Sequence, residues 1–530
     1  MRPKRRRGVS ALSDPNQEHL DNAILCTNLQ SEILSHSENG VVVIGSGPAG
    51  AAATLALIDQ GVNVTLVEAG RPKSALGLTA RVAGITMARI HRPLNPRQDG
   101  VTITGDAGTV LYEDVAPGGL TNHWSCAVPR FSSDDFEDSR RAGEKFAWPV
   151  DYADLVPWYD WVEPKLCISG CERDAPQLPA GKVTDARMLA STWRRIADDA
   201  EAVGQGVVPV PYTYGARTTL TLSGTVFNSF VRLIKPARRS RHLKIRFGAR
   251  AIQLEWSGAA KRVVAVLVQD VQTNSTTRIP CRAVVLAAGA INTTKILLQS
   301  TPPDFPEGLG NTHGVLGRYL HDHPLGKLIV QLESPLAFLP AAYVTRLPLN
   351  RSTPLYAAAC LQWSGAARLM RSVLNGRPGE SQSCGFSVFG TMAPAESNFV
   401  QLDGDRTASD GSPAVKLHIT YPSESSTTLV AARDRLIELL DGAGLKPRTE
   451  LWLIDAVGSA IHYAGTCRMH KSPHFGMLDG WNRLHAVPNV VVADSSAFTT
   501  GPEKNPVLTA MALAARASHR LAEDLRADAV

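Results

Sequence analysis

VVVIGSGPAG, residues 41–50, is the stretch that decides the fold of this chain. Its first four residues are apolar and mostly β-branched, as in a buried parallel strand, and the glycines that follow predict a tight turn. The alanine-rich stretch AAATLALIDQG (51–61) predicts a helix, and VNVTLV (62–67) predicts a second strand. Strand, helix and strand in this order form a βαβ unit, so the sequence predicts an α/β fold of the doubly wound type.

The turn carries the spacing Gly45-x-Gly47-x-x-Gly50, which suits a pyrophosphate group. Its glycines allow the backbone to approach the phosphates, and the helix that follows presents free N–H groups and the positive end of its dipole. Glu68 ends the second strand, where a carboxylate can accept hydrogen bonds from two ribose hydroxyls. The motif alone would also fit a plain tight turn, but the strand, the helix and Glu68 together predict dinucleotide binding. This motif does not distinguish FAD from NAD.

Further strands and helices are predicted along the rest of the chain from alternating or apolar runs and from helical periodicity. The expected strands are 243–247, 251–256, 263–271, 283–286 and 490–493, and the expected helices are 291–300, 427–441 and 506–525. The strands that begin near residues 41, 283 and 490 are of the type found in dinucleotide-binding sheets. We therefore expect one sheet assembled from distant parts of the chain, with a second lobe inserted between them.

Length and charge exclude several classes of protein. The 530 residues, of which 44% are hydrophobic and 20% charged, are typical of a globular protein too long for a single core. No run of about eighteen apolar residues is present, so no membrane span is expected. The net charge is +6, and part of this excess lies in the run RPKRRR at residues 2–7, so nucleic acid is a poor partner for the body of the chain.

Two features bear on the place of the protein in the cell. Residues 1–38 are expected to form a flexible basic and polar arm, because the basic run is not followed by the apolar stretch of a secretory signal. The alternative role for this arm is a basic tether to an acidic surface. The eight cysteines are scattered without a CxxC pair, which favours free thiols in a reducing cytoplasm. We therefore expect a cytoplasmic protein.

Beyond residue 40, the chain resembles the glucose-methanol-choline (GMC) oxidoreductase family in five blocks that occur in the family's order. They are the Gly45 motif with Glu68, GGLTNHW (118–124), LAAGA (286–290), VLGRYLHDHP (315–324), and HYAGTCRM (462–469) with Asn505 and Pro506. A chance match of five ordered motifs is improbable. The chain departs from the family after Ser300, where Thr301 and Pro302 replace a glycine-rich continuation, and this affects only the local loop.

The resemblance implies an α/β fold like that of the GMC oxidoreductases and p-hydroxybenzoate hydroxylase. In this fold a discontinuous Rossmann-like FAD-binding domain carries an inserted α+β substrate-binding domain. We expect the FAD-binding domain to comprise residues 39–150, 205–330 and 465–530. The substrate-binding domain is then expected to comprise residues 151–204 and 331–464.

The resemblance also implies FAD as the cofactor and assigns residues to it. Pro506 is a favourable first helical residue, so the C-terminal helix can direct its dipole at the flavin C2=O group. Asp494 can hold ribityl or phosphate-proximal groups through the N–H groups of its neighbours. The expected cofactor-binding residues are Gly45, Gly47, Pro48, Ala49, Gly50, Glu68, Gly119, Asn122, His123, Trp124, Ser125, Ile252, Ala288, Gly289, Asp494, Asn505, Pro506 and Val507.

Within the family, the stretch GGLTNHWSCAVPRF (118–131) is most similar to pyranose 2-oxidase and to bacterial sugar and glycoside 3-oxidases. In that subgroup the histidine of this block carries the flavin through a covalent bond to the 8α-methyl group. For His123 this resemblance leaves three alternatives open: a covalent bond to the flavin, noncovalent packing on it, or a structural role. Ser125 either places a hydroxyl near the flavin N5 atom or makes a turn hydrogen bond.

Oxidation of an alcohol requires a base that removes the hydroxyl proton, and histidine meets that need near neutral pH. His462 stands in the HxxGT context that bears this role in GMC enzymes. Asn505 matches the second active-site position of the family, and its amide can donate to the substrate oxygen as negative charge develops. The alternatives are a buried core histidine for His462 and an N-cap role for Asn505.

His321 and His323 flank Asp322 in a pattern that could suggest a pair of metal ligands. No metal is expected there, because the family that the chain resembles uses this block structurally.

The expected substrate is a secondary hydroxyl, at C2 or C3, of a pyranose sugar or glycoside, which is oxidised to the ketone. One alternative is a primary alcohol on an aminoglycoside or nucleoside intermediate, and another is a flavin-binding family member that is redox-silent or a lyase. O2 is the favoured electron acceptor, with a quinone or a protein as the alternatives. The stretch Gly385 to Gly390 is either a mobile substrate loop or an ordinary strand.

Overall fold

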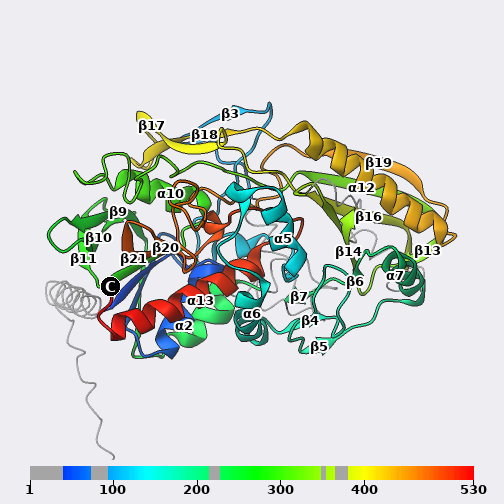
Figure 1. The fold of residues 1–530 in the computed structure, drawn as a ribbon, viewed down its shortest axis with the longest axis horizontal. Helices are drawn as coiled ribbons and strands as arrows, with labels where there is room; N and C mark the ends of the chain where they lie inside the picture. The colour runs from blue at the N-terminus through cyan, green and yellow to red at the C-terminus, as the bar shows by residue number, and fades with distance from the viewer. Residues whose placement is uncertain (1–39, 73–93, 214–226, 348–353, 364–379) are drawn as a thin grey trace, which may run out of the picture.

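The computed structural model describes residues 40–72, 94–213, 227–347, 354–363 and 380–530. The expected arm, residues 1–38, lies outside these ranges. Figure 1 shows two lobes side by side: one contains β1, β9 and α13, and the other contains β13, β16 and α12. A smaller sheet with β3, β17 and β18 lies along the top of the view.

A six-stranded sheet forms the base of the first lobe, in the order β20, β21, β12, β1, β2, β8. Its strands are β1 (Val41–Ile44), β2 (Val64–Glu68), β8 (Leu243–Phe247), β12 (Ala283–Leu286), β20 (Arg483–Leu484) and β21 (Val487–Val492). All pair in parallel except β20, which pairs antiparallel with β21. Because helices and loops cover both faces, β1 and β12 are buried along their whole length, which explains their apolar sequences. The expected sheet assembled from distant parts of the chain is therefore confirmed.

Helices and a second, antiparallel sheet complete the first lobe. The long helices α2 and α13 pack side by side, and α6 packs against α13, where the Tyr159 hydroxyl lies 2.8 Å from Thr509 Oγ1. The elements are α2 (Pro48–Asp59), α6 (Tyr152–Leu166), α10 (Ala290–Gln299), α13 (Val507–Arg526), β9 (Ala249–Ser257), β10 (Arg262–Asp270) and β11 (Thr276–Pro280).

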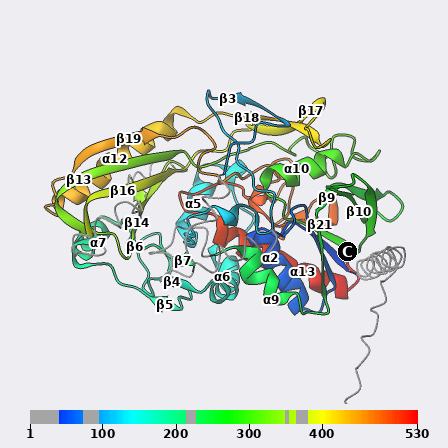
Figure 2. The same cartoon turned by 180° about the vertical axis from the view of Figure 1, so that it is seen from behind.

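The second lobe is an antiparallel sheet in the order β19, β13, β16, β15, β14, β6. Figure 2 shows α12 lying along this sheet, and α7 packs against α12 and β13. The stretch Gly385 to Gly390 belongs to β16, so it is a strand and not a loop. The elements are β6 (Val207–Pro209), β13 (Leu325–Ala337), β14 (Ala342–Leu347), β15 (Ala358–Trp363), β16 (Glu380–Gly390), β19 (Arg448–Ile454), α7 (Ser191–Ala202) and α12 (Ser423–Gly442).

Two small sheets and several short helices connect these layers. In the sheet at the top of Figure 1, β3 pairs in parallel with β18, which joins segments more than three hundred residues apart. The sheets comprise β3 (Val101–Gly105), β17 (Phe399–Thr407) and β18 (Pro413–Ile419), and β4 (Ile168–Gly170), β5 (Asp185–Ala186) and β7 (Tyr212–Thr213). The short helices are η1 (Gly119–Asn122), α5 (Ser133–Arg141), η2 (Glu144–Phe146), η3 (Phe230–Ile234), α9 (Lys235–Ala237) and η4 (Ser495–Ala497).

The division of the chain into an FAD-binding and a substrate-binding domain remains a proposal, and three elements do not follow the expected limits. β6 and the first residues of β13 belong to the antiparallel sheet of the second lobe. α6, in contrast, packs on α13 of the first lobe. β6 and β13 pair with partners distant in sequence, so local composition does not show to which lobe they belong.

Within the described ranges, no helix is both long enough and apolar enough to cross a membrane. Among the cysteines in those ranges, Cys167, Cys171, Cys281, Cys360 and Cys467 are free thiols.

Candidate functional site

A cavity of about 610 Å³ opens at the carboxyl ends of β1, β2 and β12, where parallel sheets bind their ligands. Its wall contains most of the expected cofactor-binding residues together with His462. Those on the wall are Gly45, Gly47, Pro48, Ala49, Glu68, Gly119, Ile252, Ala288, Gly289, Asp494, Pro506 and Val507. The other expected residues lie outside the wall: Gly50, Asn122, His123, Trp124, Ser125 and Asn505.

The turn between β1 and α2 has the shape that its glycines predict. Gly45 has a φ of +101°, and a Cβ there would lie 2.4 Å from the Ala287 carbonyl oxygen. A Cβ on Gly50 would lie 2.1 Å from the Gly45 carbonyl oxygen. A Cβ on Gly47 would meet no atom within 4 Å, so Gly47 faces open space at the N-terminus of α2. That space suits a phosphate group, which free helix N–H groups attract.

Glu68 lies at the cavity but is already held by the chain. Its Oε2 atom accepts hydrogen bonds from the Ser46 backbone N–H at 3.0 Å and from Ser46 Oγ at 2.5 Å, and Oε1 accepts from the Gly70 N–H at 2.7 Å. Burial raises the pKa of Glu68, and these hydrogen bonds partly oppose the rise. Ser46 and Gly70 therefore orient the carboxylate, and its binding of two ribose hydroxyls stays a prediction.

Asp494 joins two turns of the first lobe. Its carboxylate accepts hydrogen bonds from the Gly289 N–H at 3.0 Å, from Thr293 Oγ1 at 2.5 Å and from the Ser496 N–H at 3.0 Å. The Gly289 and Ser496 N–H groups are therefore directed at Asp494, because a buried carboxylate takes the nearest donors. The expected role of Asp494 in holding ribityl or phosphate-proximal groups stays a prediction.

Pro506 precedes the C-terminal helix as its N-cap, and α13 begins at Val507. The sequence expectation that Pro506 is the first helical residue is therefore displaced by one position. The Ala510 N–H donates to the Pro506 carbonyl at 3.0 Å, so the free N–H groups of the first turn follow Pro506. Pro506 and Val507 both lie on the cavity wall, and the positive end of the α13 dipole is directed there.

In the block at 118–125, Gly119 and Leu120 line the cavity, whereas residues 122–125 lie outside its wall. His123 Nε2 and Asn122 Nδ2 each lie 3.0 Å from Asp114 Oδ2, and Asp114 is itself on the wall. The indole N–H of Trp124 donates to the Phe227 carbonyl at 3.0 Å. Ser125 Oγ accepts from the Ala127 N–H at 3.4 Å, which is the turn hydrogen bond of the two alternatives. Covalent attachment of FAD to His123 remains a prediction.

His462 lies at the other end of the cavity, on a loop held by two buried neighbours. Its backbone N–H donates to Asp322 Oδ1 at 2.7 Å, and its Nδ1 atom lies 2.9 Å from His323 Nδ1. The ring of Phe389 packs against the imidazole, with 5.5 Å between centroids. Burial, with a smaller effect of His323, lowers the pKa of His462 well below 6.5, so the imidazole is neutral at neutral pH.

Asn505 is buried, with 4% of its surface exposed, next to the wall residue Pro506. In the described part of the chain its Oδ1 atom has no hydrogen-bond partner. A buried carboxamide oxygen without a partner is costly, so this group has hydrogen-bonding capacity for a ligand.

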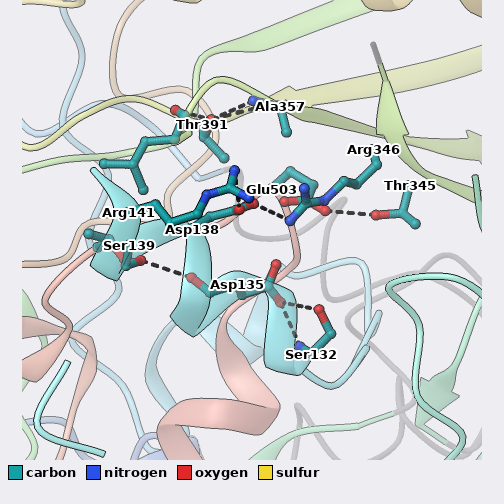
Figure 3. A network of polar contacts seen from close by, with 12 residues as sticks. Ser132, Asp135, Asp138, Ser139, Arg141, Thr345, Arg346, Ala357, Thr391 and Glu503 are labelled. Atoms are coloured by element: carbon teal, nitrogen blue, oxygen red, sulfur yellow. Dashed lines mark hydrogen bonds and ion pairs between the residues drawn. The ribbon is translucent and has the colours of Figure 1, made fainter. Parts of the chain in front are cut away.

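A network of buried charges lies directly before Asn505 in the sequence. Lys504 Nζ lies 2.8 Å from Asp135 Oδ1 and 3.0 Å from Glu503 Oε1, and Thr345 Oγ1 donates to Glu503 Oε1 at 2.7 Å. In Figure 3, Thr345 and Glu503 lie on one side of this network, and Asp135 of α5 lies on the other. The network ties the segment that carries Asn505 both to α5 and to β14 of the second lobe.

Sequence reasoning missed several polar residues on the wall. Ser46 and Asp114 orient other site residues, as described above. Lys295 of α10 donates to Ser412 Oγ at 3.1 Å, and burial lowers its pKa to about 8. Arg97 forms an ion pair with Glu113. The signal available for Lys295 was its position in the predicted helix 291–300, six residues after Gly289. Arg97 and Glu113 lie on the wall without a local sequence pattern.

These observations test whether the residues fit FAD. The turn at Gly47 leaves room that a side chain would fill, Glu68 and Asp494 are fixed at the strand ends, and the α13 N-terminus points into the same cavity. Arg97, Arg250 and Lys295 line it as well, with Arg97 paired to Glu113 and Arg250 to Asp410. The open phosphate turn and the helix N-terminus in one cavity therefore fit a dinucleotide.

Three family models match the chain: FAD binding domain over residues 40–106, and two GMC oxidoreductase models over residues 141–325 and 394–514. The chain is 27% identical to 2-methyl-1,2-propanediol dehydrogenase of Mycolicibacterium austroafricanum, across 91% of this chain and 95% of that protein. It is 28% identical to 6'''-hydroxyparomomycin C oxidase of Streptomyces lividus, across 92% of each. The solved structure of pyridoxine 4-oxidase from Mesorbium loti has a TM-score of 0.61 at 18% identity, covering 91% of this chain and 98% of that one, and so has the same fold.

Proposed function

Because the chain belongs to the GMC oxidoreductase family and is an FAD-dependent alcohol oxidoreductase, we propose that it oxidises a hydroxyl group of a sugar or glycoside with His462 as the base. The observation that carries this proposal is the position of His462. A neutral imidazole lies on the wall of the same cavity as the phosphate turn at Gly47. Pro506 and Val507, which follow Asn505, lie on that wall too.

FAD, which the turn at Gly47 and the wall residues around Glu68 and Asp494 would hold, would supply the hydride acceptor for the alcohol carbon. His462 takes the hydroxyl proton at the same reacting group, so the O–H and C–H bonds both break and a carbonyl forms. A neutral imidazole can accept this proton, and a charged one cannot. Asn505 supports the step by hydrogen bonding to the substrate oxygen through its buried carboxamide. The N-terminus of α13 adds positive potential at the end of the cavity next to Pro506.

We infer that the preferred substrate is a secondary hydroxyl, at C2 or C3, of a pyranose or glycoside. The resemblance of residues 118–131 to sugar and glycoside oxidases supports this substrate class. The product of this reaction is a ketone.

A primary alcohol on an aminoglycoside is the second candidate. It is favoured by the full-length similarity to 6'''-hydroxyparomomycin C oxidase. The product of this reaction is an aldehyde.

A panel of substrates under anaerobic conditions tests both candidates. Neutral pyranoses, methyl glycosides, aminoglycosides and nucleosides are each mixed with the FAD-loaded enzyme, and loss of the flavin absorbance near 450 nm is followed. NMR of the product then distinguishes ketone from aldehyde. Peroxide release in air tests O2 as the acceptor. If no alcohol reduces the flavin, the proposed function is wrong.

A further inference from the structure

His323 is the partner of His462 in a directed hydrogen bond. It lies directly before Pro324 and β13, with 3% of its surface exposed. The two Nδ1 atoms are 2.9 Å apart, and the two rings are nearly perpendicular, at 82°. At this distance one of the two nitrogens carries the proton and the other accepts it. The identity of the donor decides which nitrogen of His462 can act as a base.

The second contact of His323 identifies the donor. Its ring hydrogen-bonds to the backbone of Pro502, and proline has no N–H, so the Pro502 carbonyl accepts and the ring donates. The ring nitrogen on that side is Nε2, since a Cβ built on Gly501 would lie 3.4 Å from it. Burial lowers the pKa of His323 to about 4, so the ring is neutral and carries one proton. With that proton on Nε2, Nδ1 of His323 is an acceptor.

The proton between the two rings therefore belongs to His462 Nδ1. The lone pair of His462 is then on Nε2, and His462 lies on the cavity wall. We propose that His323 is a positioning residue that fixes His462 in the tautomer with a bare Nε2, through the chain His462 Nδ1–H to His323 Nδ1 and His323 Nε2–H to the Pro502 carbonyl. This inference rests on the proposed function of His462 as the base, and it assigns the atom that accepts the proton.

The same chain stabilises the product of proton transfer. When the hydroxyl proton moves to Nε2, His462 becomes an imidazolium, and its Nδ1–H bond to His323 becomes charge-assisted. Near His323, Glu503 favours positive charge. His321 is neutral there, because burial lowers its pKa to about 4. His323 thus holds the charged ring of His462 in the orientation of the neutral one.

Asp322 and Ile461 fix the backbone while His323 fixes the ring. Ile461 has a φ of +62°, which is unusual for a β-branched residue. The Asp322 carboxylate accepts the His462 N–H at 2.7 Å and so restrains the loop in this conformation. Because the loop is restrained in this way, its movement cannot compensate for the other tautomer of the His462 ring. The hydrogen bond to His323 therefore selects the tautomer.

Two substitutions distinguish the loss of the hydrogen-bond acceptor of His323 from the loss of its side-chain volume. His323→Asn keeps a carbonyl oxygen near the position of Nδ1, where it can accept from His462 Nδ1–H. His323→Gln places its amide near the position of Nε2, beside Pro502, and removes the acceptor. We expect flavin reduction to stay within about tenfold of the parent rate in His323→Asn and to fall by about 100-fold or more in His323→Gln. FAD content and the substrate concentration for half-maximal reduction should be unchanged in both.

A purely space-filling His323 predicts the opposite order, because glutamine is closer to histidine in volume; that order overturns the proposal. His313→Ala is the control, since this exposed histidine lies outside the cavity wall.

Neutron diffraction from a deuterated crystal of the FAD-loaded enzyme provides a readout that does not depend on any substrate. We expect deuterium on His462 Nδ1 and on His323 Nε2, and none on His462 Nε2. Deuterium on His462 Nε2 together with His323 Nδ1 would overturn the inference. Failure of every alcohol to reduce the flavin, in contrast, contradicts the proposed function while leaving this tautomer assignment intact.

Discussion

The two ends of the cavity are built in different ways. The phosphate end is one contiguous turn between β1 and α2, and its shape depends on backbone conformation and on the absence of side chains. The reacting end brings together His462, His323 and the segment before Asn505, which are far apart in sequence. The first end is thus sensitive to added atoms, whereas the second is sensitive to the identity and protonation of single side chains.

The largest expected effect is at the phosphate end. Gly47→Val places a side chain in the open space at the α2 N-terminus, so we expect loss of FAD binding and a colourless purified protein. The ratio of absorbance at 450 nm to that at 280 nm measures this directly. Gly442→Val is the matched control, because a Cβ at Gly442, at the end of α12, also meets no atom within 4 Å. A yellow Gly47→Val protein would contradict the assignment of this turn.

The next effect distinguishes the two ends. His462→Ala should leave FAD bound and reduce the rate constant of flavin reduction by about 10²–10⁴-fold, the usual contribution of a positioned base. Anaerobic stopped-flow measurements give the rate, and the spectrum of the purified protein gives the FAD content. Near-normal reduction in this variant would refute the role of His462. Loss of FAD together with activity would mean that the two ends are not independent.

The ion network behind Asn505 is expected to matter for stability. Lys504→Met leaves Asp135 and Glu503 buried without their shared cation, so the free energy of unfolding should fall by about 3–5 kcal/mol. Urea unfolding followed by circular dichroism measures the change. The control is Arg140→Met, which removes an exposed ion pair with Glu137 and should cost less than about 1 kcal/mol. Equal effects of the two substitutions would show that the buried network does not hold this segment.

The smallest expected effect is that of pH on the reacting end. Because the pKa of His462 lies well below 6.5, the base is already deprotonated above that pH. The rate constant of flavin reduction should therefore change by less than about twofold from about pH 8 to about pH 6.5, and fall only at lower pH as the imidazole becomes protonated. Rapid mixing at constant ionic strength tests this. A fall centred at pH 6.5 or above would contradict the burial of the base.

Much of the first lobe could be predicted from local sequence. The expected strands 243–247 and 283–286 coincide with β8 and β12, and the expected helix 506–525 differs from α13 by one residue at each end. These elements have continuous apolar or periodic patterns. The strands β3, β6, β14 and β15 were not predicted. β3 and β6 pair with strands distant in the chain, and β14 and β15 are buried along almost their whole length, so they lack the alternation of a half-buried strand.

The residues of the candidate site can be divided in the same way, into those predicted from motifs and those found only in the structure. His462 and Asn505 were proposed from motifs, and the Gly45 to Gly50 turn from its spacing. His323 was expected to be structural from the family resemblance, and no local pattern relates it to His462, 139 positions away. Ser46, which orients Glu68, is inside the motif but at a position that the glycine spacing leaves open.

By itself the sequence determined a βαβ unit with a glycine-rich turn, and the motifs shared with the GMC family predicted a histidine and an asparagine for alcohol oxidation. Glycine spacing and apolar runs act over a few residues, so they can be recognised without the fold. Only the tertiary structure decided that Ser46 and Gly70 hold Glu68, that Asp494 binds turn N–H groups, and that His323 faces His462. Hydrogen bonds between buried groups depend on which segments meet in the core, and that is a property of the packed chain as a whole.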